Sequence, residues 1–431
     1  MAKHRTLCLA VLCSLFGLAN DVPVSAQSDD TGESRWYKGN MHTHSLWSDG
    51  NDFPEMICDW YLQNGYHFLT LSDHNVLSTN ANKWISPDLA AKRGAIGALE
   101  RYQERFGTFW VERKKQPNGE VVRLKTLEEF RGLFEKPEEF LLIQAEEITD
   151  HVGPTPVHIN ATNIAELIRP MGGTTVREAI RNNLQAVLRQ EEQLDRPIFA
   201  HLNHPNFGFA VTAEDMAAVV EEQFFEVFNG HPSVRQRGDN QHASIERMWD
   251  IANTIRIAQM DKPPLFGVAT DDAHRYFGTQ GSSPGRGWVM VRAGKLKTET
   301  LIKALRAGDF YSSSGVTLNT VDFDGKKLSL VIDGEEGVTY TTYFIGTRRG
   351  YEAKREPVLD ANGDELPVTG RYSDTVGQIL ASVNGLKPSY VFKGDELYVR
   401  ARIDSTKPHD NPAWEDQKKQ AWTQPVGWRK K

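Results

Sequence analysis

The segment Trp36-Tyr37-Lys38-Gly39-Asn40-Met41 has the pattern of a short β-strand, and it leads directly into His42-Thr43-His44 and then Ser48-Asp49-Gly50. Side chains two positions apart on an extended chain point the same way. His42 and His44 can therefore reach one cation, with Asp49 arriving from the loop beyond them. A lone His-x-His is weak support for a metal site, because histidines at the surface or in the core often do nothing chemical. Other residues of the chain are needed to show whether His42 and His44 bind metal.

Short apolar segments recur after this one, and most are separated by helical patterns. We predict seven strands, at residues 37–41, 67–71, 140–145, 157–161, 198–202, 224–228 and 265–269. Apolar residues at three- and four-residue spacing predict helices at 54–64, 176–194, 213–222 and 243–260. Thr175 and Thr212 are placed to cap two of these helices. This rhythm is typical of a β/α barrel, whose active site lies at the carboxyl ends of its strands.

Metal-competent side chains stand at the ends of all but one of these segments. The exception, residues 224–228, is followed only by Asn229 and His231, which are weaker candidates. The others supply His42, His44, Asp49, Asp73, His74, Glu146, Glu147, His158, His204, Asp272 and His274. Any one of these could be incidental. Imidazoles from several strands at one edge, with carboxylates beside them, instead indicate a metal centre.

Taken together, these motifs resemble the polymerase and histidinol phosphatase (PHP) family of metal-dependent phosphoesterases, over roughly residues 36–315. The matching segments are His42-Thr43-His44 with Ser48-Asp49-Gly50, Leu71-Ser72-Asp73-His74, Ala145-Glu146-Glu147-Ile148-Thr149, Ala200-His201-Leu202-Asn203-His204-Pro205-Asn206 and Asp272-Ala273-His274. The resemblance implies a distorted seven-stranded, TIM-like β/α barrel. It favours Glu147 over Glu146 and His204 over His201 as ligands, and it leaves Asp271 outside the ligand set.

The resemblance also implies a division of the ligands among two or three divalent ions. His42, His44, Glu147 and Asp272 would hold the first ion, and Glu147 would bridge to a second ion held by His158 and His204. Asp49, His74 and His274 would hold a third. Imidazole and carboxylate ligands suit zinc, manganese or iron, and the absence of thiolates argues against a structural cysteine site.

Such a centre predicts a hydrolase. Two cations about 3.5–4 Å apart can share and activate a bridging water, which then attacks phosphorus without any side-chain nucleophile. We therefore expect a small phosphorylated substrate, either a phosphomonoester or a phosphodiester. Hydrolysis of carboxylic or carbamate esters on the same centre is the alternative, and a non-catalytic module that binds metal or carbohydrate is a third reading.

Several other polar residues could support the reaction. Asp73 could orient His74, although a surface or capping role would also explain this carboxylate. Arg275 and Arg286 could grip phosphate, against the alternative of ordinary surface salt bridges. His231 and His201 are placed for proton transfer, which the local sequence does not establish.

The remaining organisation follows from composition. Residues 1–26 read as a secretory signal, so we expect an exported protein, periplasmic or extracellular, without a membrane anchor. The barrel would span residues 27–315, with an insertion at 76–139 near its mouth; a small β-sandwich would follow at 316–405, and then an irregular tail at 406–431. The formal net charge of −7 gives no general attraction to nucleic acid, which we do not expect as a partner. The sequence carries no signal for the oligomeric state.

Overall fold

The computed structural model describes residues 34–277 and 281–429, so the predicted signal segment 1–26 lies outside the described residues. These residues form eight α-helices and 21 β-strands. A strand is present at each of the seven predicted positions: β1 (Arg35–Asn40), β2 (Phe68–Leu71), β6 (Leu141–Val152), β7 (Thr155–Thr162), β8 (Phe199–Leu202), β9 (Phe224–Asn229) and β10 (Phe266–Thr270). They lie side by side in the order β10-β9-β8-β7-β6-β2-β1.

Strand β7 breaks the expected parallel pattern, because it runs antiparallel to both of its neighbours, β6 and β8. The other six strands share one direction, since β1, β2 and β6 pair in parallel and so do β8, β9 and β10. The register Val152↔Thr155 leaves Gly153 and Pro154 as a two-residue turn, and Gly153 has the positive φ of 58° that such a turn favours. Chain reversal here replaces the expected crossover.

The seven strands do not close into a continuous barrel ladder. A single parallel bridge joins Thr43, just beyond β1, to Ala273, just beyond β10, and the His44 amide donates to the Ala273 carbonyl at 2.9 Å. On its other side β1 pairs with β11 (Trp288–Ala293), which pairs with β12 (Phe310–Ser313). The seven strands therefore belong to an open mixed sheet, and the ends of β1 and β10 approach each other at the edge that carries His44.

Helices cover this sheet through apolar faces. They are α1 (Pro54–Gln63), α4 (Leu127–Phe134), α5 (Val176–Leu194), α6 (Ala213–Ala218), α7 (Ile245–Thr254), which continues into a π-helical turn η1 (Ile255–Gln259), and α8 (Thr298–Ala307). Thr175 and Thr212 cap α5 and α6 as predicted. Helix α6 is shorter than predicted. In the described ranges, no helix is long and apolar enough to cross a membrane.

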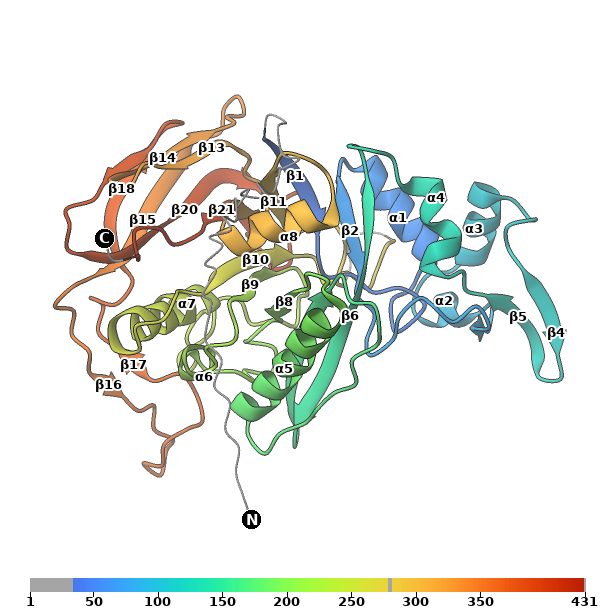
Figure 1. Ribbon diagram of the computed structural model, residues 1–431, viewed down its shortest axis with the longest axis horizontal. Coiled ribbons are helices and arrows are strands. Elements are labelled where there is room, and N and C mark those ends of the chain that lie inside the picture. Colours follow the sequence, from blue (N-terminus) through green and yellow to red (C-terminus); the bar gives the residue numbers. More distant parts are fainter. Residues whose placement is uncertain (1–33, 278–280, 430–431) are drawn as a thin grey trace, which may run out of the picture.

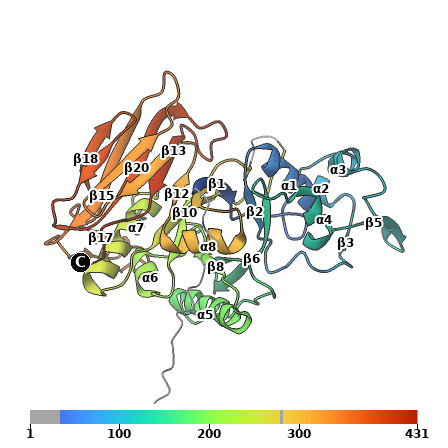
Figure 2. The same ribbon diagram turned by 45° about the horizontal axis from the view of Figure 1, so that its top comes forward.

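The segment between β2 and β6 is an excursion with its own small core. It contains β3 (Trp84–Ile85), α2 (Leu89–Lys92), α3 (Ala98–Phe106), β4 (Arg113–Gln116) and β5 (Gly119–Arg123), followed by α4. Pairing of Gln116 with Gly119 puts the hairpin turn at Pro117 and Asn118, one residue before the predicted Asn118-Gly119. Figures 1 and 2 show this excursion at one end of the molecule and the C-terminal strands at the other.

The C-terminal β unit, residues 316–429, has two sheets facing each other across an apolar core. One sheet contains β13 (Leu318–Phe323), β14 (Lys327–Ile332) and β19 (Ser389–Val391). The other contains β15 (Tyr340–Arg348), β18 (Gln378–Asn384), β20 (Glu396–Pro408) and β21 (Lys418–Thr423). A short ribbon of β16 (Arg355–Glu356) and β17 (Arg371–Tyr372) lies outside both sheets.

The predicted irregular tail at 406–431 is wrong for its central part. Strand β21 pairs with both β12 and β20, so the sheet of the C-terminal β unit is continuous with that of the preceding α/β unit. Ala421 and Trp422 of β21 are buried. The strand went unpredicted because Lys418-Lys419-Gln420 hides its pattern and its partners are distant in sequence.

Candidate metal centre

All nine predicted ligands converge at the sheet edge where the carboxyl ends of the six co-directional strands meet. They form overlapping groups in which the ligand atoms lie within 4.8 Å of one another. His158 reaches this edge from the fourth residue of β7, because that strand runs in the opposite direction. Glu147 lies inside β6 rather than after it, since β6 continues to Val152.

The first group contains His42, His44, Glu147 and Asp272. Asp272 Oδ1 lies 3.3 Å from His42 Nε2 and 3.1 Å from His44 Nε2. The two oxygens of Glu147 lie 3.5 Å from His42 Nε2 and 3.4 Å from His44 Nε2. These four side chains are almost completely buried. Two imidazoles and two carboxylates therefore enclose one point shielded from water.

The second group is centred on the other side of Glu147. Its Oε1 lies 3.0 Å from His158 Nδ1 and 3.5 Å from His204 Nε2. Its Oε2 lies 2.7 Å from His74 Nδ1. Glu147 thus contacts five imidazoles and lies between the first and second groups.

The third group is more open to solvent. Asp49 Oδ1 lies 3.4 Å from His274 Nε2 and 3.6 Å from His44 Nδ1, and Asp49 Oδ2 lies 3.5 Å from His74 Nε2. His44 therefore presents one nitrogen to the first group and the other to the third. The boundary between these groups is less sharp than the family pattern implies.

Strong mutual electrostatics hold the cluster together. Burial lowers the pKa of His42, but Asp272, Glu226 and Glu147 outweigh this effect and hold it well above its usual value. Burial raises the pKa of Glu147, yet the surrounding imidazoles hold it well below its usual value. His44 behaves differently, because burial and the charges of His274 and His74 lower its pKa to about 3. The centre thus combines anionic carboxylates with an imidazole that stays neutral, which is the form that binds metal.

Three buried atoms at the centre of the cluster test whether cations fit there. Among the described residues, His42 Nε2, His44 Nδ1 and Glu147 Oε2 make no hydrogen bond, although Glu147 Oε2 pairs with His74 Nδ1 at 2.7 Å. Buried polar atoms are rarely left unsatisfied in a folded protein, and a bound ion can satisfy them. All three belong to residues whose donor types suit divalent zinc, manganese or iron. The residues therefore fit the predicted ions.

The backbone is unusual at two of the predicted ligands. His204 has a φ of 22° and Asp272 a φ of 49°, in the region that residues other than glycine seldom occupy. Such strain persists only where surrounding contacts enforce it, and it is concentrated at functional sites. Here it turns each side chain back over the sheet edge just after β8 and β10.

Glu146, Asp271 and His201, which the sequence did not favour as ligands, make contacts outside the three groups. Glu146 faces the opposite side of β6, where its Oε1 accepts from the Ile168 amide at 2.7 Å and burial raises its pKa to about 8. Asp271 accepts hydrogen bonds from the amides of residues 285–287 and from the Tyr61 hydroxyl. His201 lies behind His42, with Nε2 3.6 Å from Glu226 Oε1.

The prediction that Asp73 orients His74 is wrong. The Asp73 carboxylate instead accepts hydrogen bonds from the amides and hydroxyls of Ser45 and Ser48, at 2.6–3.0 Å. It therefore shapes the loop between His44 and Asp49. Successive side chains point in opposite directions, so Asp73 and His74 cannot both face the cluster. His74 Nδ1 lies instead 2.5 Å from the Thr149 hydroxyl and 2.7 Å from Glu147 Oε2.

The two predicted phosphate-binding arginines differ. Arg286 is buried, and its guanidinium donates to the carbonyls of Gly230, Gly281 and Asn411, so a phosphate-binding role for it is wrong. Arg275 follows His274 and is partly exposed. A Cβ on Gly94 would lie 3.3 Å from Arg275 Nη1, so this guanidinium borders the excursion between β2 and β6.

Glu226 in β9 is the functional candidate that sequence reasoning missed. It is fully buried, and its Oε1 lies 2.7 Å from His42 Nδ1. A signal was present, because Glu226 is the only charged residue in the apolar run Phe224-Phe225-Glu226-Val227-Phe228. A buried charge in such a strand must be paired with another group. The Asn203 amide was also missed, and it donates to Glu147. Asn229, a weaker ligand candidate in the sequence, donates to Asp272.

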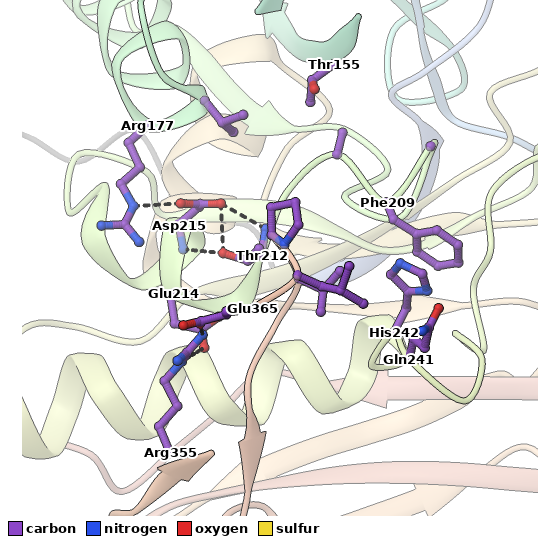
Figure 3. Close-up of a pocket in the computed structure, with 16 residues that line it drawn as sticks. Thr155, Arg177, Phe209, Thr212, Glu214, Asp215, Gln241, His242, Arg355 and Glu365 are labelled. Atoms are coloured by element: carbon purple, nitrogen blue, oxygen red, sulfur yellow. Dashed lines mark hydrogen bonds and ion pairs between the residues drawn. The ribbon is translucent and has the colours of Figure 1, made fainter. Parts of the chain in front are cut away.

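A cleft of about 970 Å³ lies away from this cluster, between the first residues of α5 and α6 and the segment 365–368 (Figure 3). None of the nine predicted ligands lines it. Its charged side chains pair with each other, Arg177 with Asp215 at 2.6 Å and Arg355 with Glu214 and Glu365 at 2.9 and 2.7 Å (Figure 3). It therefore offers no unpaired charge to a substrate.

An α/β sheet edge carrying clustered imidazoles and carboxylates defines a candidate multinuclear metal centre. No protein-family model matches the sequence, and a search of curated proteins finds no match. Among solved structures, the chain is similar to a two-domain protein from Bacteroides vulgatus that contains a predicted PHP-like metal-dependent phosphoesterase, with 14% identity over 91% of this chain and 95% of that chain and a TM-score of 0.39.

Two further solved structures cover a smaller part of the chain. A candidate metal-dependent phosphoesterase from Bifidobacterium adolescentis is 13% identical over 56% of this chain and 89% of its own, with a TM-score of 0.26. An amidohydrolase from Chromobacterium violaceum, with bound sulfate and no metal, is 12% identical over 57% of this chain and 89% of its own, with a TM-score of 0.27. Identities of 12–14% and these TM-scores do not establish a shared activity.

Proposed function

We propose that the protein is a PHP-type metal-dependent phosphoesterase acting on a small phosphorylated substrate. Two or three divalent ions, of manganese, zinc or iron, would be held by His42, His44, Asp49, His74, Glu147, His158, His204, Asp272 and His274. The observation that carries the proposal is the buried convergence of these side chains around three polar atoms that lack hydrogen-bond partners in the described part of the chain. Bound cations would satisfy these atoms and the surrounding carboxylates together.

Ions bound there would lower the pKa of a water molecule and neutralise charge on phosphoryl oxygens. The chain's own residues would position the substrate. His231 is placed to donate a hydrogen bond from Nε2 to a substrate oxygen rather than to transfer a proton, because its ring centroid lies 5.5 Å from that of His274. The Ser233 amide donates to His231 Nδ1 at 3.1 Å, which leaves the proton of the neutral ring on Nε2. Burial lowers the pKa of His231, which favours the neutral ring that the Ser233 contact requires.

Two arginines beside the third group favour an anionic substrate. Arg93 Nη1 donates to the carbonyl of Gly50, next to Asp49, at 2.8 Å, and Arg275 follows His274 in the sequence. Guanidinium groups at these positions suit a bound phosphate. They would have no comparable role toward a neutral carboxylic or carbamate ester. Hydrolysis of such esters on the same ions is the second candidate.

The test is hydrolysis of 4-nitrophenyl phosphate, bis(4-nitrophenyl) phosphate and 4-nitrophenyl acetate by protein loaded with Mn²⁺, Zn²⁺ or Fe²⁺. We expect turnover of at least one phosphate ester, and its loss in His44→Ala. His242→Ala is the matched control, because His242 stacks on Phe209 outside the cluster. Turnover of the acetate alone would favour the second candidate. Metal-loaded protein that hydrolyses none of the three would favour a binding module.

We also propose that the protein is exported, on the basis of the basic, apolar and small-residue pattern of residues 1–26. N-terminal sequencing of protein expressed with its own N-terminus tests this proposal. A mature chain beginning at Gln27 is expected, and an intact N-terminus would contradict it.

A further inference from the structure

Glu226 is a fully buried carboxylate on β9, directly behind the proposed metal ligands. It is not among those ligands, and it has no role in the proposed chemistry. Burying a charge without compensating contacts costs free energy. The polar partners of Glu226 that supply this compensation therefore indicate its role.

Each oxygen of Glu226 has two hydrogen-bond partners, and His201 Nε2 lies at the longer distance of 3.6 Å from Oε1. Oε1 lies 2.7 Å from His42 Nδ1 and accepts from the Thr270 hydroxyl at 2.7 Å. Oε2 accepts from the backbone amide of His204 at 2.7 Å and from the Asn229 side-chain amide at 2.8 Å. Two of these partners, His42 and His204, are proposed ligands of different ions.

We propose that Glu226 is a positioning residue that orients two metal ligands at once, the imidazole of His42 and the strained backbone of His204. This inference rests on the proposed function. A proton on His42 Nδ1 is donated to Glu226, which leaves the Nε2 lone pair free to face Glu147 and Asp272. The same carboxylate anchors the amide of His204, whose φ of 22° needs such a restraint.

The arrangement couples the first and second groups through one side chain. A carboxylate that accepts the second N–H of a ligating imidazole holds the ring in place and makes it a better donor to metal. Glutamine cannot reproduce this. Its amide nitrogen would have to face either the hydroxyl and imidazole donors at Oε1 or the two amide donors at Oε2. Glu226→Gln therefore removes the negative charge, and it also places the amide N–H group of glutamine against hydrogen-bond donors.

The experiment measures zinc affinity of the full chain by competition with a chromophoric chelator. Glu226→Gln is expected to weaken zinc binding by about 10- to 100-fold. Glu222→Gln is the matched control, because Glu222 is equally buried four residues earlier but bonds only to the amides of Gln223 and Phe224. Control and wild type should bind zinc equally.

A second measurement does not depend on whether Glu226→Gln folds. In zinc-loaded wild-type protein with ¹⁵N-labelled histidine, His42 is expected to carry its proton on Nδ1 and to bind zinc through Nε2. A His42 ring bound through Nδ1 would overturn the inference, as would Glu226→Gln binding zinc within twofold of wild type. Wild-type protein that binds no zinc, manganese or iron would overturn the proposed function and this inference together. Zinc binding without phosphatase activity would leave the role of Glu226 intact.

Discussion

A buried ion pair joins the two units of the molecule, and replacing Asp250 with asparagine should destabilise both together. Asp250 lies in α7 and Arg400 in β20. Arg400 Nε and Nη2 donate to the two oxygens of Asp250 at 2.8 and 2.7 Å, and the Tyr398 hydroxyl donates to Oδ1 at 2.8 Å. The side chains of Asp250 and Arg400 are only 5% and 1% exposed. Asp250→Asn keeps the shape but leaves the guanidinium with only the longer contact of Arg400 Nη1 to Glu246 Oε2, at 3.2 Å.

The expected cost follows from this burial. Removing one partner of a buried ion pair costs about 3–5 kcal/mol, because the remaining charge stays in the interior. A chain of 431 residues has an unfolding entropy near 0.9 kcal/mol/K, so the expected fall in Tm is about 3–6 °C. Replacing both partners with apolar residues, as in Asp250→Leu with Arg400→Met, should recover much of that loss.

Scanning calorimetry measures this effect, with Asp309→Asn as control. Asp309 pairs with Arg292 at 2.8 Å, but their side chains are 49% and 37% exposed. An exposed pair contributes under about 1 kcal/mol, which corresponds to about 1 °C or less here. Equal Tm shifts for the two variants would refute the reasoning. Two separate transitions in the wild type would show that the units unfold independently, which contradicts the continuous sheet and this buried contact.

Two further substitutions test other parts of the account. Burial raises the pKa of Glu222 from 4.5 to about 8, so folding opposes its ionisation and the penalty grows as pH rises from 4.5 towards 8. Glu222→Gln should therefore raise the free energy of unfolding by on the order of 3 kcal/mol at pH 7 and leave it unchanged at pH 4, measured by urea denaturation; an equal gain at both pH values would be inconsistent with this cause. His231→Ala should lower kcat by about 10²-fold, because it removes the Nε2–H donor, while metal content stays unchanged, measured by kinetics and elemental analysis. Loss of metal in that variant would instead identify His231 as a ligand.

The strands of the α/β unit were largely predictable from sequence, because each is a short apolar run bounded by polar residues. The direction of β7 was not, since a two-residue turn at Gly153-Pro154 and a longer connection leave similar apolar patterns on either side. Strand β21 escaped prediction for another reason. Its stability comes from pairing with β12 and β20, and its own sequence is half polar.

Residues of the candidate metal centre were predictable where they follow strands. His74, His204, Asp272 and His274 belong to this class, because strand ends of one direction meet at one edge. Orientation within a strand was harder to predict, and Asp73 was assigned to the wrong face. Glu226 was missed because it lies inside strand β9, whereas the predicted ligands were sought at the residues that follow strands.

Metal content of the purified protein tests the central claim most directly. After loading with Zn²⁺ and removal of excess metal, elemental analysis of the wild type should give two to three ions per chain. Glu147→Gln should retain at most one, because Glu147 contacts His42, His44, His74, His158 and His204 within 3.5 Å. A folded wild-type protein that binds no ion after loading with Zn²⁺, Mn²⁺ or Fe²⁺, or a Glu147→Gln variant with full occupancy, would contradict the account.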